Sequence, residues 1–241
     1  MLIAIGAFLL SLVPCILLLI WLKKQNEDKG YQTSYKRAMK YGLLSVFPVI
    51  GVAAVFALIS LAFPKDLPVL AKEAYKDFIL AAFAEELVKF LLFKKVLKES
   101  GYNYSWRDIT AFMIVIGVGF EMMEAILYAL MTNPGQILVR GILIVHAGYA
   151  YIMGKYYGKA LVTGKKGWYV FAFLVPFLLH GLYDYGLTPE LQEWNDNTVF
   201  ISVTLAFIGL ITLIRLILFF RKAKKEEIYT RPLLAAVEEE A

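Results

Sequence analysis

Long apolar runs separated by short polar stretches dominate the chain. Each run is about 20 residues long, enough for an α-helix to cross roughly 30 Å of hydrocarbon. None shows the strict alternation that marks the strands of a membrane barrel. The pattern predicts an all-α, polytopic membrane bundle with about seven transmembrane helices. The expected spans are residues 2–22, 41–63, 77–97, 108–131, 137–158, 168–187 and 197–220.

Composition agrees with a bilayer as the solvent. The chain has 60% hydrophobic and 19% charged residues and a mean hydropathy of +0.64, which is too apolar for an ordinary soluble domain. We therefore expect a single integral-membrane domain at residues 1–220, placed in the cell membrane. Residues 221–241 are rich in charge, and we expect them to form a mobile cytoplasmic tail.

The basic residues predict the orientation of the bundle. Most of the 25 Lys and Arg fall in the segments after the first, third, fifth and seventh spans. Because basic residues in short loops mark the cytoplasmic side, the N-terminus is expected outside and the C-terminus in the cytoplasm. The net charge of +5 is therefore a topology signal. Without a basic face interleaved with aromatic residues, we expect no nucleic-acid partner.

Ionisable residues inside the predicted spans need an explanation. A charged group deep in a bilayer costs roughly 2.5 to 3.5 kcal/mol even on the lenient insertion scale. At 1.5 Å per residue, the acidic and histidine side chains lie about 10 to 15 Å below the outer ends of their spans, and Asp184 about 5 Å below. This common depth predicts one polar site near the outer face. Its candidate residues are Glu85, Glu86, Lys89, Glu121, Glu124, His146, His180 and Asp184.

Helical spacing suggests which basic residues are structural. Glu85 lies four residues before Lys89 and can form an ion pair with it, while Glu86, three residues away, can compete for the same ammonium. We interpret Lys89 as a structural and electrostatic residue. Arg140 is near the outer end of the fifth span, where a long side chain reaches the headgroups.

The remaining pairs point to hydrolytic chemistry. Glu121 and Glu124 share one face of the fourth span, and His180 and Asp184 share one face of the sixth. A carboxylate can act as general base toward water, and an imidazole N–H held by a carboxylate can stabilise an oxyanion. The preferred interpretation needs no cofactor. A divalent metal such as zinc is the alternative, with His146, His180, Glu86 and Glu124 as candidate ligands.

Three motifs carry a resemblance to a known family. Glu85-Glu86-Leu-Val-Lys89 looks like EExxK, Phe120-Glu121-Met-Met-Glu124 like FExxE, and His180-Gly-Leu-Tyr-Asp184 like HxxxD. In this order, over residues 40–190, they resemble the PrsW family of intramembrane proteases. That family is similar to the type II CAAX-processing and bacteriocin-immunity membrane proteases, from which this chain departs at Lys89, one position early, and at Glu124, where that group has a histidine.

The resemblance implies an activity, a site and a substrate class. It implies hydrolysis of a peptide bond by water activated at Glu85 or Glu86, with His180 and Asp184 orienting or stabilising the intermediate. The implied substrate is a single-pass membrane protein, anti-sigma-factor-like or otherwise membrane-anchored, cut near its extracytoplasmic side. Two alternatives stay open: a proton- or ion-coupled transporter, since Glu and His chains also form proton relays, and a non-catalytic multi-pass scaffold.

Overall fold

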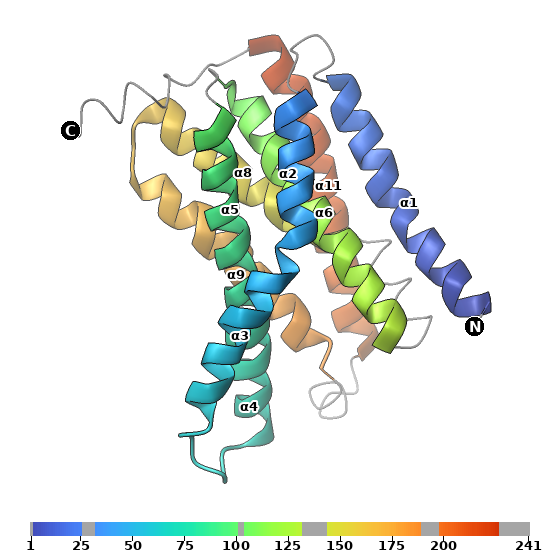
Figure 1. Cartoon of the computed structure of the whole chain (residues 1–241), viewed down its shortest axis with the longest axis vertical. Coiled ribbons are helices and arrows are strands. Elements are labelled where there is room, and N and C mark those ends of the chain that lie inside the picture. The colour runs from blue at the N-terminus through green and yellow to red at the C-terminus, as the bar shows by residue number, and fades with distance from the viewer. Residues whose placement is uncertain (1, 26–31, 101–103, 132–143, 189–197, 227–241) are drawn as a thin grey trace.

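The computed structural model describes residues 2–25, 32–100, 104–131, 144–188 and 198–226. Within these ranges the regular elements are helices, which form seven rods packed as one bundle (Figure 1). The predicted all-α bundle is confirmed. The elements are α1 (Leu2–Gln25), α2 (Gln32–Leu44), α3 (Val46–Ser60), α4 (Val69–Tyr75), η2 (Lys76–Phe83), α5 (Ala84–Ser100), α6 (Trp106–Met131), α8 (Val145–Thr163), α9 (Gly167–Gly186) and α11 (Thr198–Glu226).

The second rod is bent and longer than predicted. Its two halves, α2 and α3, meet at Ser45, whose hydroxyl donates to the carbonyl oxygen of Gly42 at 2.6 Å. The rod begins at Gln32 rather than at residue 41 because α2, although polar, is amphipathic and turns Ser34 and Ala38 into the bundle, where it packs against α5 and α6. Hydropathy alone could not extend the helix over these polar residues.

The third rod is continuous from α4 through η2 to α5, and so begins before the predicted residue 77. Its middle, η2, is a π-helix, which widens the helical turn directly before the Glu85-Glu86 pair. π-Helical turns are rare and are found mostly at functional sites. This turn sets the direction in which the first turn of α5 points its side chains.

The core of the bundle is α6. Its residues from Asp108 to Phe120 are buried between α2, α8 and α1, as Figure 1 shows for its central position. Gly117 allows a close approach to α8, because a Cβ at this position would lie 2.7 Å from the carbonyl oxygen of His146. The rigid contact between α6 and α8 places the fourth and fifth rods at a fixed distance at the level of the polar residues.

Large apolar side chains cover much of the outer surface, which suits hydrocarbon rather than water. Exposed examples on α1, α3, α9 and α11 are Leu17, Leu58, Leu182 and Leu218. Three stretches among the described residues are long and apolar enough to cross a membrane: Ile5–Gln25, Gln32–Ser60 and Trp106–Ala129. The rods containing α5 and α8 are more polar because they carry the ionisable residues. The inside-outside orientation stays a prediction.

Two sequence-based expectations fall at the edges of the described structure. Helix α11 continues to Glu226, so the beginning of the predicted tail at residues 221–226 is helical. Residues 227–241 and Arg140 lie outside the described residues.

Candidate active site

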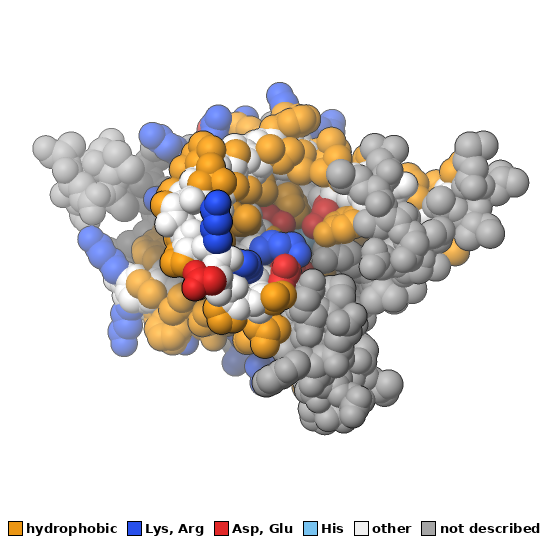
Figure 2. All heavy atoms as spheres, turned by 90° about the horizontal axis from the view of Figure 1, so that it is seen from below, with side chains coloured by type: hydrophobic (Ala, Val, Ile, Leu, Met, Phe, Trp, Pro, Cys, Tyr) orange, Lys and Arg blue, Asp and Glu red, His pale blue; other side chains and the backbone are white. Residues whose placement is uncertain are grey.

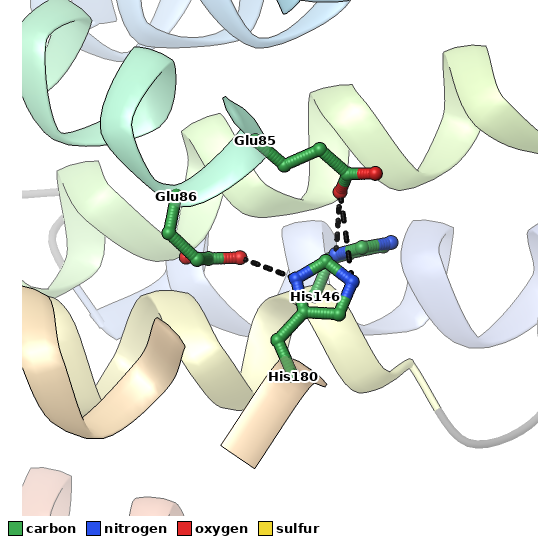
Figure 3. A group of neighbouring side chains, drawn as sticks. All are labelled: Glu85, Glu86, His146 and His180. Atoms are coloured by element: carbon green, nitrogen blue, oxygen red, sulfur yellow. Dashed lines mark hydrogen bonds and ion pairs between the residues drawn. The ribbon is translucent and has the colours of Figure 1, made fainter. Parts of the chain in front are cut away.

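Three helices bring the predicted site residues together. Glu85 and Glu86 stand in the first turn of α5, His146 in the first turn of α8, and His180 in the second half of α9. One nitrogen or oxygen atom of each side chain can be chosen so that all four atoms lie within 4.8 Å of one another. Figure 3 shows the four side chains pointing toward a common centre. We call this set the Glu-His centre.

Part of the polar cluster reaches the surface. At the end of the bundle where α4 lies, Figure 2 shows acidic and basic side chains among hydrophobic ones. The side chains of Glu85, Glu124 and Asp184 keep 10 to 14% of their surface exposed, whereas those of Glu86 and His180 keep at most 2%. Glu85 is therefore more accessible to water than Glu86.

Glu86 is the best-paired carboxylate of the centre. Its Oε1 accepts from the Lys89 ammonium at 2.6 Å and lies 3.0 Å from Nδ1 of His180. Lys89 is 3.7 Å from Oε2 of Glu85, so Glu86 holds the closer ion pair. The predicted competition for this ammonium is thus resolved toward Glu86. A buried cation shared between two carboxylates offsets part of their negative charge inside the bundle.

Glu85 is held more loosely. Its Oε2 is 3.7 Å from Nε2 of His180 and 3.8 Å from Nδ1 of His146, longer than hydrogen bonds. This oxygen and Oε2 of Glu86 are both buried without a hydrogen-bond partner. Buried carboxylate oxygens without partners are costly, and a water molecule or a cation in the centre would satisfy them.

Each histidine is held from both sides. In His180, Nδ1 faces Glu86 and Nε2 lies 3.1 Å from Oδ2 of Asp184, as the four-residue spacing predicted. In His146, the Lys89 ammonium lies 3.2 Å from Nδ1 and Oε2 of Glu124 lies 2.8 Å from Nε2. Because an ammonium can only donate, Nδ1 of His146 is the acceptor and Nε2–H donates to Glu124.

Glu121 contacts the centre through the backbone of His146. Its Oε2 accepts a hydrogen bond from the backbone N–H of His146 at 2.9 Å, in the first turn of α8. A carboxylate at a helix N-terminus satisfies a free N–H and interacts well with the helix dipole. The residue before that turn, Ile144, has a left-handed φ of 43°. Glu121 therefore positions His146 rather than contributing its own side chain to the centre.

Two aromatic rings contact the centre, and sequence reasoning missed one of them, Tyr149. The Tyr149 ring stacks on His180 with centroids 4.9 Å apart and an interplanar angle of 19°. The Phe120 ring lies 4.5 Å from the Lys89 ammonium and 4.9 Å from the His146 ring. Phe120 was visible in the FExxE motif, and Tyr149 lies three residues after His146, on the same helix face. The spacing of Tyr149 from His146 was the signal that sequence reasoning could have used.

The donor set of the centre suits a metal ion. Imidazole nitrogens and carboxylate oxygens are ordinary ligands of zinc, and the unpartnered oxygens of Glu85 and Glu86 are available to a cation. The structure brings His146, His180 and Glu86 together as expected, with Glu85 as the fourth member. Glu124, expected as a ligand, instead contacts the outer nitrogen of His146, where it can orient the ring.

Comparison with known proteins agrees with the motifs. A family model described as "PrsW family intramembrane metalloprotease" matches residues 35–214. Protease PrsW of Geobacillus kaustophilus is 30% identical over 228 residues, 92% of each chain. Protease PrsW of Bacillus subtilis is 31% identical over 223 residues, 89% of this chain and 93% of that protein. No solved structure gives a significant match.

Proposed function

Since the chain belongs to the PrsW family of intramembrane metalloproteases, and is a protease of the membrane, we propose that its Glu-His centre hydrolyses a peptide bond of a membrane-anchored protein. The observation that carries this proposal is the convergence of two carboxylates and two imidazoles from α5, α8 and α9 within 4.8 Å. Four such groups in an apolar bundle carry an energetic cost, which indicates a functional role. Peptide hydrolysis can use both the proton-accepting carboxylates and the imidazoles.

We assign the general base to Glu85. Its side chain keeps 10% of its surface exposed, and its buried Oε2 has no hydrogen-bond partner, so this carboxylate can accept a proton from water. Glu86 is fully buried and already paired with Lys89 and His180, which suits a fixed anionic partner better than a proton acceptor. The sequence left the general base open between Glu85 and Glu86. Burial and pairing favour Glu85.

The ammonium of Lys89 can stabilise the negative charge that develops in the reaction. Attack of water on a peptide carbonyl produces an oxyanion, and fixed donors in a dry site stabilise it. Lys89 can only donate, and its ammonium lies within the centre, 3.2 Å from Nδ1 of His146. This side chain is almost completely buried, so its position is set before substrate binds.

The family's description implies a metal, and the donor set fits one. His146, His180 and Glu86 would hold it, with Glu124 and Asp184 orienting the two imidazoles from their outer nitrogens. When bound, a zinc ion would supply Lewis acidity and would lower the pKa of bound water. Glu85 serves as the base in either case. The earlier preference for a cofactor-free reaction gives way here to metal assistance.

We further propose a multi-pass protein of the cell membrane that cuts a single-pass substrate near its extracytoplasmic side. The centre lies toward the end of the bundle that carries α4, and the positive-inside rule places that end outside. Membership of a protease family favours an enzyme over the transporter and scaffold alternatives. An anti-sigma-factor-like substrate remains part of the proposal.

The test compares conservative variants of the centre in cells. Wild type, Glu85→Gln, Glu86→Gln and His180→Ala are co-expressed with a panel of single-pass membrane proteins tagged at both ends. Glu99→Gln, on the same helix but exposed and paired with Arg37, is the control. We expect the centre variants to insert normally and to lose cleavage by about 100-fold or more, while the control cuts as wild type does. Wild-type cleavage by all three variants would refute the assignment.

Metal assistance is tested separately on purified protein. Exhaustive chelation should abolish cleavage, and adding zinc should restore it. Full activity without metal would contradict the metal part of the proposal, including the ligand roles of His146, His180 and Glu86, while leaving Glu85 as the base.

A further inference from the structure

A second cleft lies away from the Glu-His centre, between α1, α2 and α6. Its volume is about 430 Å³. Leu19, Met39 and Val115 provide an apolar floor, and Lys23, Lys36 and the half-buried ring of Tyr35 line the rest. The proposed reaction assigns no role to this cleft.

The two lysines stand at one end of the cleft. Lys23 is in the last turn of α1 and Lys36 is near the start of α2, and these helix ends lie at the same end of the bundle, opposite α4 (Figure 1). Both side chains are exposed. Within the described part of the chain, neither ammonium forms an ion pair with a carboxylate. The cleft thus combines two positive charges at its rim with an apolar interior.

We propose that this cleft binds an acidic phospholipid. The phosphate lies between Lys23 and Lys36, and one acyl chain runs along Leu19, Met39 and Val115. An acidic headgroup matches the charge of the rim, and the acyl chain matches the floor. A free phosphate ion would leave the apolar floor unused.

The walls of the cleft also favour lipid over a protein segment. Helix α1 exposes Leu17 and Ile20, and the second rod exposes Leu44, so the surface around the cleft is one that faces acyl chains. A partner helix is about 10 to 12 Å wide with its side chains, so even two turns of it exceed the 430 Å³ of this cleft, which a single hydrocarbon chain can fill. Lipid in this place connects α1 to α2 and should stabilise the folded bundle by binding it selectively.

The test uses the full-length protein in mild detergent, with phosphatidylglycerol as the acidic probe and phosphatidylcholine as the zwitterionic one. Native mass spectrometry counts retained lipid, and thermal unfolding reports stabilisation. We expect one tightly retained phosphatidylglycerol and a higher Tm than with phosphatidylcholine. Equal retention of the two lipids would overturn the proposal. An equal rise in Tm with inorganic phosphate alone would also overturn it, because the site would then recognise a free anion.

Matched variants separate this site from general attraction to positive charge. The double variant Lys23→Gln/Lys36→Gln should bind phosphatidylglycerol about 30-fold more weakly, from the loss of two lysine–lipid contacts. Lys24→Gln/Lys40→Gln removes the same charge from exposed neighbours outside the cleft and should bind as wild type does. Met39→Trp fills the floor without changing charge and should also weaken binding. Equal losses in the two double variants, or normal binding by Met39→Trp, would refute the site.

Discussion

Gly181 lies next to His180 where α9 packs against η2, and its substitution should displace the histidine. A Cβ at Gly181 would overlap the ring of Phe78, whose Cε1 lies 2.6 Å from the ideal Cβ position. That ring is in contact with those of Phe177 and Tyr185, each with its centroid 6.2 Å away, so it cannot simply turn aside. The variant Gly181→Ala should therefore push α9 away from η2.

The contact distances give the size of the effect. Relieving the overlap to ordinary carbon separation needs a movement of at least about 1 Å, because Cδ1 of Phe78 lies closer still than Cε1. The hydrogen bond between His180 and Glu86 is 3.0 Å long, so a movement of that size breaks it. Overpacking costs typically about 1 to 3 kcal/mol, of which roughly 0.5 to 1 is recovered because alanine favours a helix more than glycine does. A 1 Å displacement of a catalytic group can lower a rate about 100-fold.

The assay combines substrate cleavage with thermal unfolding in detergent. Gly167→Ala is the control, because it lies on the same helix and a Cβ there meets nothing within 4 Å. Removing the obstructing ring in the double variant Gly181→Ala/Phe78→Ala should recover cleavage relative to Gly181→Ala alone. If Gly181→Ala cleaves like Gly167→Ala, or if the double variant recovers nothing, the steric argument is wrong.

Four further variants test the neighbours of the centre. Tyr149→Phe keeps the ring stacked on His180 and should cleave within about threefold of wild type, whereas Tyr149→Ala should lose about 3 to 5 kcal/mol of unfolding free energy, measured by denaturation. Glu124→Gln should weaken zinc binding by about 10- to 100-fold, measured with a competing chelator, because it orients His146; unchanged affinity would contradict this. Lys89→Met should strengthen zinc binding by roughly tenfold or more in the same assay, because its ammonium lies among the proposed ligand atoms; weaker binding would count against that competition.

Helical spacing predicted the contacts that lie within one helix. The pairs His180–Asp184 and Glu86–Lys89 follow from spacings of four and three residues. The common depth of the ionisable residues predicted that α5, α8 and α9 would meet, and their donor atoms do converge. These features depend only on the regular geometry of a helix and on the cost of placing charge in hydrocarbon.

Contacts between helices were less accessible to sequence reasoning. The distinction between Glu85 and Glu86 depends on the π-helical turn of η2, which no hydropathy pattern reports. The cap that Glu121 forms on His146 depends on the distance between α6 and α8, which Gly117 sets through a contact far along the chain. A single sequence shows which residues are polar, but the rotation of each helix about its axis follows from packing.

The central claim is that the carboxylates and imidazoles of the Glu-His centre act as one catalytic unit. The most direct measurement is the cleavage rate of Glu86→Gln, His180→Ala and the double variant in reconstituted vesicles, with the same tagged substrate throughout. Because the two side chains are joined at 3.0 Å, the double variant should lose no more activity than the worse single variant. Losses that multiply in the double variant would show independent action and would contradict the account.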